Sequence, residues 1–215
     1  MARKLVIIPI IHSEAEMGSL NTAITEVLDE AFGKDSRDEH RKQVLTFWDN
    51  ISALTQKILK AVDPSSIVLY QDGMPAGGEV GRRLVEEGVK DHIPNHRILQ
   101  SLIEAGARLE KTENPTFLKQ EYGILREILC AESGEKRESL AAHYQARLGQ
   151  LTQDRDVYIG RQIDETLKDG ETGIVFIGAS HDIGSHLPRT IRVYVRNKDT
   201  DVELLEWLKS IETGG

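Results

Sequence analysis

Two histidines far apart in this chain follow hydrophobic runs and have the chemistry of an active site. His12 comes directly after the run 5–11, and His181 follows the run 173–178 in a short glycine-bearing loop. Imidazole is the commonest general acid–base group near neutral pH and a frequent ligand of divalent metals. Glu110, in a weakly strand-like stretch, would add a carboxylate. Together these side chains predict a pocket that either binds a divalent metal of unknown identity through His12 and His181 or polarises water directly.

Arg155 is a further candidate, because it opens a helix that we expect to begin after Thr152, where a cation is unfavourable next to the helix dipole. An arginine in that place needs a partner, such as a carboxylate, an anionic substrate group or a developing oxyanion. Gly178 would let a ligand approach the backbone, and Asp182 either contributes to the same site or caps a following helix. The sequence therefore predicts His12, Glu110, Arg155 and His181 as catalytic residues, with Gly178 and Asp182 as ligand-binding residues.

Each of these residues also has a purely structural interpretation. His12 can simply end a strand, Glu110 and Arg155 can be solvated surface residues, and Asp72 beside Gly73 is typical of a turn. Most other residues with reactive side chains receive structural interpretations: His40, His92, His96 and His143 as surface residues, and Cys130 as a small buried residue. His186, five residues after His181 in the same loop, is a reserve ligand.

The elements that must position these side chains follow from the hydrophobic pattern. Runs that predict strands are 5–11, 67–70, 106–111, 173–178 and 191–195. Three of them are continuous, which is typical of strands buried on both faces of a parallel sheet, whereas the alternation in 191–195 favours an edge. Helical patterns cover 13–32, 35–62, 75–90, a helix after Pro94, 116–151 with a break at 133–134, 152–170 and 201–211.

This alternation predicts a single α/β domain over 1–215, with a central, largely parallel sheet flanked by helices. The surplus of helix in the middle predicts a helix-rich subdomain within 112–152. In an open parallel sheet, ligands bind beyond the carboxyl ends of the strands. If the predicted strands are neighbours, the candidate side chains meet at that edge.

Composition narrows the classes of partner. Asp and Glu total 35 against 27 Lys and Arg, so the formal net charge is -8, which disfavours nucleic acid and anionic membranes. The first apolar run is too short for a membrane span, and a single cysteine fits a reducing compartment. We expect a cytoplasmic protein whose partner is a small molecule, with a homo-oligomer left open.

The segment 155–181 resembles the C-terminal pattern of the TraB/ChaN/erythromycin-esterase-like superfamily. In that pattern an arginine opens a helix, and the following hydrophobic strand ends in GxxH, here Gly178-Ala-Ser-His181. His12 matches the histidine that ends the family's first strand, with Pro9 in place of the usual glycine, and Leu109-Glu110 matches a family LE pair. The resemblance implies an α/β fold with a His/Glu/Arg pocket, in a superfamily that includes metal-dependent proteases, an esterase acting on macrolides and a haem-associated lipoprotein.

Residues and resemblance together predict a hydrolase-like enzyme, with metal dependence left open. Two alternatives remain. One is a non-catalytic binding protein for an anionic small molecule, with Arg155 and the loop amides around Gly178 as donors. The other is a structural role in which the long helices pack against a partner chain.

Overall fold

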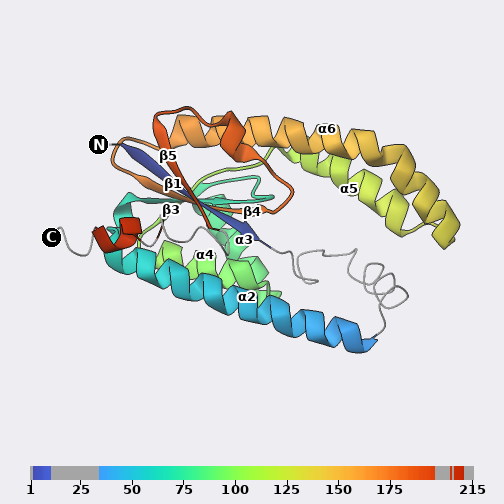
Figure 1. Cartoon of the computed structure of the whole chain (residues 1–215), viewed down its shortest axis with the longest axis horizontal. Coiled ribbons are helices and arrows are strands. Elements are labelled where there is room, and N and C mark those ends of the chain that lie inside the picture. The colour runs from blue at the N-terminus through green and yellow to red at the C-terminus, as the bar shows by residue number, and fades with distance from the viewer. Residues whose placement is uncertain (1, 11–33, 197–203, 205, 211–215) are drawn as a thin grey trace.

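The computed structural model describes residues 2–10, 34–196, 204 and 206–210. Its five strands are β1 (Arg3–Ile10), β2 (Ile67–Gln71), β3 (Arg108–Leu109), β4 (Thr172–Gly178) and β5 (Ile191–Val195). They form one sheet in the order β3-β2-β4-β1-β5, and every pair is parallel (Figure 1). The predicted α/β class with a parallel central sheet is confirmed. His12 and the predicted helix 13–32 lie outside the described residues.

The continuous apolar runs fill both faces of this sheet. In β1, Val6 and Ile8 belong to the core on one face, while Leu5 and Ile7 belong to the core on the other. The same alternation holds in β2 and β4. Because successive side chains point to opposite faces, a strand covered on both sides needs apolar residues throughout.

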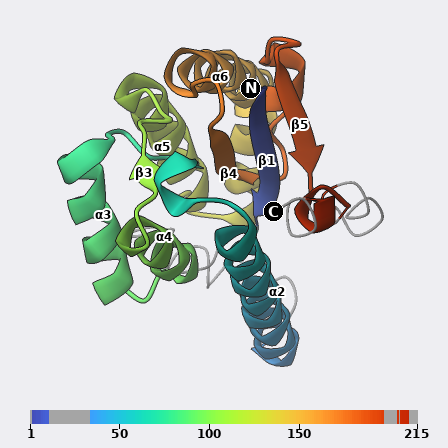
Figure 2. The same ribbon diagram turned by 90° about the vertical axis from the view of Figure 1, so that its left-hand side faces the viewer.

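Helices form the outer layers. On one face the core includes residues of α2 (Lys34–Ala61), α3 (Gly78–Lys90), α4 (Pro94–Glu104) and the helical residues 204 and 206–208, and on the other it includes α6 (Gly134–Thr166). Figure 2 shows the sheet between these layers. Two short 3₁₀ helices complete the described elements, η2 (Pro64–Ser66) and η3 (Ile183–His186). No helix among the described residues is long and apolar enough to cross a membrane.

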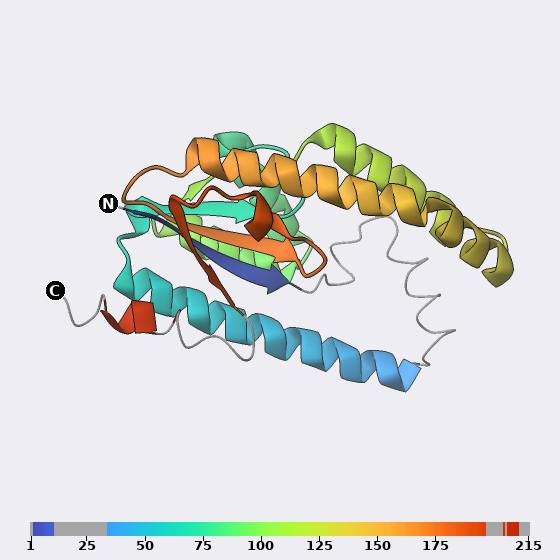
Figure 3. The same ribbon diagram turned by 45° about the horizontal axis from the view of Figure 1, so that its top comes forward.

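The helix-rich middle segment is a hairpin of two helices. α5 (Pro115–Leu129) packs against α6, and both extend well past the sheet (Figures 1 and 3). The break at 133–134 is confirmed, because Ser133 caps α6 by accepting a hydrogen bond from the Lys136 N–H at 3.2 Å. Cys130, expected to be buried, is exposed at the end of α5.

The prediction of a new helix after Thr152 is wrong. α6 runs without interruption from Gly134 to Thr166, and the Thr152 hydroxyl donates to the Leu148 carbonyl at 3.1 Å inside the helix instead of capping one. Arg155 therefore lies in a helix interior, and the helix dipole does not explain why it needs a partner. The explanation is its burial, described below.

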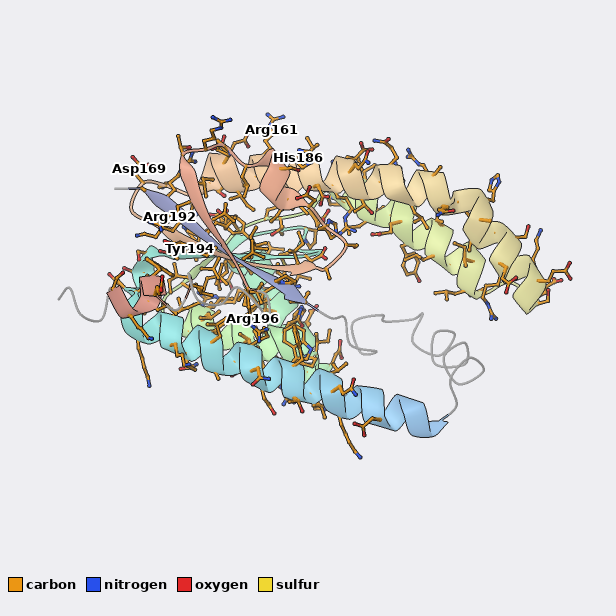
Figure 4. The ribbon with its side chains drawn as sticks, viewed as in Figure 1. Arg161, Asp169, His186, Arg192, Tyr194 and Arg196 are labelled. Carbon is orange, nitrogen blue, oxygen red and sulfur yellow. The ribbon has the colours of Figure 1, made fainter. Side chains whose placement is uncertain are left out.

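β5 is the edge strand that its alternation predicted. Tyr194 stacks on Trp207 with 5.0 Å between ring centroids, and the Arg192 guanidinium lies 5.2 Å from the Tyr194 ring (Figure 4). This stacking joins β5 to the C-terminal helical residues and helps to cover one face of the sheet beside β1.

η3 packs directly on α6 at Gly160. A Cβ on Gly160 would lie 2.9 Å from the His186 Cβ and 3.0 Å from its carbonyl oxygen. Figure 4 shows His186 of η3 over α6, beside Arg161. Since backbone is one of the atoms met, η3 would have to move, and η3 directly follows the loop that carries His181.

We expect Gly160→Ala to lower the free energy of unfolding by about 1–3 kcal/mol through overpacking. Gly149 lies on the same helix, and a methyl group there would meet no atom within 4 Å, so Gly149→Ala is the matched control and should gain up to about 1 kcal/mol in helix propensity. Urea unfolding of both variants measures the effects. A neutral or stabilising Gly160→Ala would contradict the close packing of η3 on α6.

Candidate functional site

A turn at the end of β2 places Asp72 at the carboxyl edge of the sheet. The Met74 N–H donates to the Gln71 carbonyl at 3.0 Å, and Gly73 adopts a φ of 75° that other residues rarely accept. The Asp72 N–H donates to the Phe176 carbonyl of β4 at 2.8 Å. Its carboxylate Oδ2 then accepts the Gly178 N–H at 2.9 Å. The Asp72 side chain is thus fixed where β2 and β4 end.

The loop after β3 delivers Glu113 to the same place. The N–H groups of Thr112 and Glu113 both donate to the Met74 carbonyl, at 3.0 and 2.9 Å. The Thr112 hydroxyl also accepts the Gln71 N–H at 3.1 Å. These bonds join the loops after β2 and β3, so that the Glu113 carboxylate enters the interior with no exposed surface.

Arg155 lies between three carboxylates. Its Nε donates to Glu113 Oε1 at 2.9 Å, its Nη1 to Glu121 Oε2 at 2.8 Å and its Nη2 to Asp72 Oδ1 at 2.5 Å. The residue is 5% exposed, in line with Leu151, Ile159 and Ile163 on the buried face of α6. Charge-assisted hydrogen bonds of this kind compensate the cost of burying an arginine.

Asp156, the next residue on α6, holds His181. The Nδ1 of His181 lies 2.5 Å from Asp156 Oδ1, and Asp156 Oδ2 accepts the Asp182 N–H at 3.0 Å. The other ring nitrogen, Nε2, is 3.7 Å from Asp72 Oδ2, too far for a direct hydrogen bond. The His181 side chain is 4% exposed. Asp156 therefore fixes both the imidazole and the loop that carries it.

A pocket of about 500 Å³ opens beside these groups. Its walls come from the carboxyl ends of β2 and β4, from the start of α4 and from the α5–α6 hairpin. The lining residues are Gln71, Asp72, Gly73, Ile93, Asn95, His96, Leu118, Glu121, Leu125, Thr152, Arg155, Gly178, Ala179, Ser180 and His181. A volume of this size suits a small organic ligand.

The pKa values of Glu113 and Arg155 are both raised, but for different reasons. Burial raises the pKa of the Glu113 carboxyl above its usual value, and this effect outweighs the hydrogen bond and the charge of Arg155, which lower it. For Arg155, burial by itself lowers the pKa, but Asp72 and Glu113 outweigh burial and the net shift is upward. Arg155 stays charged, whereas the Glu113 carboxyl takes up a proton more readily than an ordinary glutamate.

This raised pKa predicts how stability depends on pH. Between the usual Glu value of 4.5 and the raised one, the folded state holds a proton that the unfolded state has lost. The Glu113 contribution to the free energy of unfolding is therefore greatest below pH 4.5 and falls as pH rises, with a slope of at most about 1.4 kcal/mol per pH unit. We expect the difference between wild type and Glu113→Gln, measured by urea unfolding across this range, to fall in the same way. A difference that grows with pH would contradict the upward shift.

The structure brings Arg155 and His181 together through Asp72, but it places Glu110 elsewhere. The Glu110 carboxylate accepts a hydrogen bond from Arg108, and Arg108 also binds Glu171, the residue that precedes β4. Glu110 does not line the pocket, and the position predicted for it is taken by Glu113. The physical reason is that β3 ends at Leu109, so the chain turns into the site only at Thr112.

The two predicted ligand-binding residues have different surroundings. Gly178 lines the pocket, and its N–H donates a hydrogen bond to Asp72 Oδ2. Asp182 is exposed, does not line the pocket and precedes η3 without a capping hydrogen bond from its side chain. His96, expected at the surface, is half-buried and lines the pocket. His186 packs on α6, away from the pocket lining.

The predicted metal site remains a prediction. Within the described residues, no three or more His, Cys, Asp or Glu side chains are grouped so as to hold a metal ion. His181 Nδ1 binds Asp156, and both oxygens of Asp72 already accept hydrogen bonds. His12, the second predicted ligand, lies outside the described residues, so the histidine pair cannot be placed.

Three residues that the sequence did not predict as catalytic or ligand-binding are central here: Asp72, Glu113 and Asp156. Asp72 precedes Gly73, a pair that is typical of an ordinary turn. Glu113 was one of two carboxylates, with Glu110, near a weakly predicted strand. A signal for Asp156 was present, because Arg155 and Asp156 interrupt the apolar spacing 151–159–163 on α6. Two adjacent opposite charges on a buried helix face indicate partners from other elements.

Comparisons of the chain with protein-family models, with curated proteins and with solved structures found no significant match. The resemblance of 155–181 to the TraB/ChaN/erythromycin-esterase-like superfamily therefore stays a prediction, and the function proposed for the chain rests on the geometry of the site.

Proposed function

We propose that this chain is a hydrolase in which His181 acts as the general base that activates water. The observation that carries the proposal is the Asp156–His181 pair at 2.5 Å, whose histidine lies in the wall of a pocket of about 500 Å³. A carboxylate bound to Nδ1 fixes the tautomer and orientation of an imidazole, and leaves Nε2 as the nitrogen that takes a proton.

The other groups have supporting roles in this proposal. Arg155 positions Asp72, Glu113 and Glu121, since each of its three nitrogens already donates to a carboxylate. The backbone N–H groups of Ala179 and Ser180, exposed residues in the wall beside His181, are the proposed donors to a developing oxyanion. A divalent metal bound by His12 and His181 is an alternative to this base, because it would occupy the Nε2 that otherwise takes the proton. Its chemistry would be to lower the pKa of a bound water.

Binding of an anionic small molecule without turnover is less well supported. In that interpretation Arg155 donates to the anion, but the Arg155 guanidinium already pairs with three carboxylates. An anion would have to displace one of them in a site that already carries several negative charges.

The proposal is tested with p-nitrophenyl acetate, p-nitrophenyl butyrate, an aryl lactone and an aryl amide as probes. We expect saturable hydrolysis of at least one probe, and a fall of about 10–100-fold in kcat/KM for Asp156→Asn, whose amide no longer orients the imidazole correctly. Asp154 lies two residues earlier on α6 and accepts a hydrogen bond from Gln150, so Asp154→Asn is the matched control and should keep full activity. Absence of saturable hydrolysis, or equal loss in both variants, would contradict the proposal.

A further inference from the structure

The charges of the described residues around the pocket are unbalanced. Four carboxylates, those of Asp72, Glu113, Glu121 and Asp156, contact one guanidinium and one imidazole. If Glu113 alone among the carboxylates is protonated, three negative charges remain. Arg155 contributes one positive charge, and His181 contributes a second one if its imidazole is protonated. The described cluster is therefore net negative whether or not His181 carries a proton.

No described arginine or lysine in the pocket wall remains available for an anionic ligand. Among the described residues that line the pocket, Arg155 is the one arginine and no lysine occurs.

Two buried amide oxygens beside the pocket lack donors. Gln71 is 3% exposed and Asn95 is 2% exposed, and both residues line the pocket. Gln71 Oε1 and Asn95 Oδ1 have no hydrogen-bond partner within the described part of the chain. Buried acceptors normally find a donor, so these oxygens indicate a ligand that brings hydrogen-bond donors.

Glu121 is the carboxylate best placed to meet such a ligand. It lies on α5, lines the pocket and is 25% exposed at its side chain, whereas Asp72 is 5% exposed and Glu113 fully buried. Its Oε2 accepts from Arg155, while its Oε1 has no hydrogen bond to a described residue. Leu118 and Leu125, one turn to either side on the same helix, add apolar wall next to it.

We propose that this pocket takes a protonated amine with an apolar body, and that Glu121 is the residue that binds the ammonium group. The unpaired amide oxygens of Gln71 and Asn95 supply further acceptors, and the leucines of α5 contact the apolar part. The inference rests on the proposed function only in treating this pocket as the substrate site.

The experiment compares the binding of three probes of matched size, benzylammonium, benzyl alcohol and benzoate, to the whole chain by NMR titration at low salt. We expect benzylammonium to bind at least about tenfold more tightly than benzoate, with benzyl alcohol between them. Glu121→Gln should reduce benzylammonium affinity at least about tenfold and leave benzyl alcohol unchanged. Glu127 is an exposed residue of the same helix outside the pocket, and Glu127→Gln should bind like wild type.

Three results would overturn the inference: benzoate binding as tightly as benzylammonium, no binding of benzylammonium at millimolar concentration, or equal effects of Glu121→Gln and Glu127→Gln. None of these measurements requires turnover. A chain that binds benzylammonium through Glu121 but hydrolyses no probe would remove the proposed enzyme and keep the amine pocket, so the two failures are distinguishable.

Discussion

Replacing His181 by glutamine is expected to lower kcat/KM for the most reactive probe by about 10²–10⁴-fold, the range typical of general base catalysis. Glutamine can still donate a hydrogen bond to Asp156, which keeps the loop 178–182 in place, but its amide cannot accept a proton from water. The loss should therefore appear in kcat/KM, with only a small change in the free energy of unfolding.

His143 provides the control for this variant. It lies exposed on the part of α6 that extends past the sheet, in edge contact with Tyr144. His143→Gln should match wild type in both kcat/KM and urea unfolding. If His181→Gln kept most of the activity, the base would have to be another group and the assignment of His181 would be wrong.

Replacing Arg155 by methionine should cost about 3–5 kcal/mol in the free energy of unfolding, the effect of removing one partner from a buried ion pair. Methionine fills much of the volume but removes the guanidinium that lies between Asp72 and Glu113. Urea unfolding at neutral pH measures the loss, and acid should reduce it, because protonation removes the uncompensated charge.

Two further variants make the Arg155 result specific. Arg155→Lys keeps the charge but presents a single ammonium where the guanidinium reaches three carboxylates, so an intermediate loss is expected. Arg161 is exposed on the same helix and pairs with Glu165 one turn later, and Arg161→Met should cost no more than about 0.5 kcal/mol. Equal losses for Arg155→Met and Arg161→Met would show that the carboxylate cluster is not what makes Arg155 important.

Local pattern was sufficient to predict the strands and the parallel class of the sheet, but not the order of the strands. Runs such as 67–70 and 173–178 are apolar at every position, and only strands covered on both faces require this. The start of α6 was predicted at the break 133–134, but a second start at Thr152 was wrong. A threonine favours a cap only where the helix before it ends, and here the preceding turn continues through the Thr152–Leu148 hydrogen bond.

The candidate site was only partly predictable, because its contacts are not local. Arg155 and His181 were identified, yet the partners of Arg155 lie 83, 42 and 34 residues away along the chain, at Asp72, Glu113 and Glu121. The choice between Glu110 and Glu113 depends on where a strand of two residues ends, which no periodicity reveals. Because carboxylates saturate the guanidinium of Arg155, the ligand that we propose is a cation, whereas the sequence alone led us to expect an anion.

The central claim is that Asp156 holds the imidazole of His181 through Nδ1 and leaves Nε2 for proton transfer. Long-range ¹H–¹⁵N NMR of histidine-labelled chain tests it directly, since the spectrum reports which ring nitrogen carries the proton. We predict a strongly deshielded proton on Nδ1 of His181 in wild type that is lost in Asp156→Asn and unchanged in Asp154→Asn. A neutral His181 with its proton on Nε2, or a spectrum that does not respond to Asp156→Asn, would contradict the account.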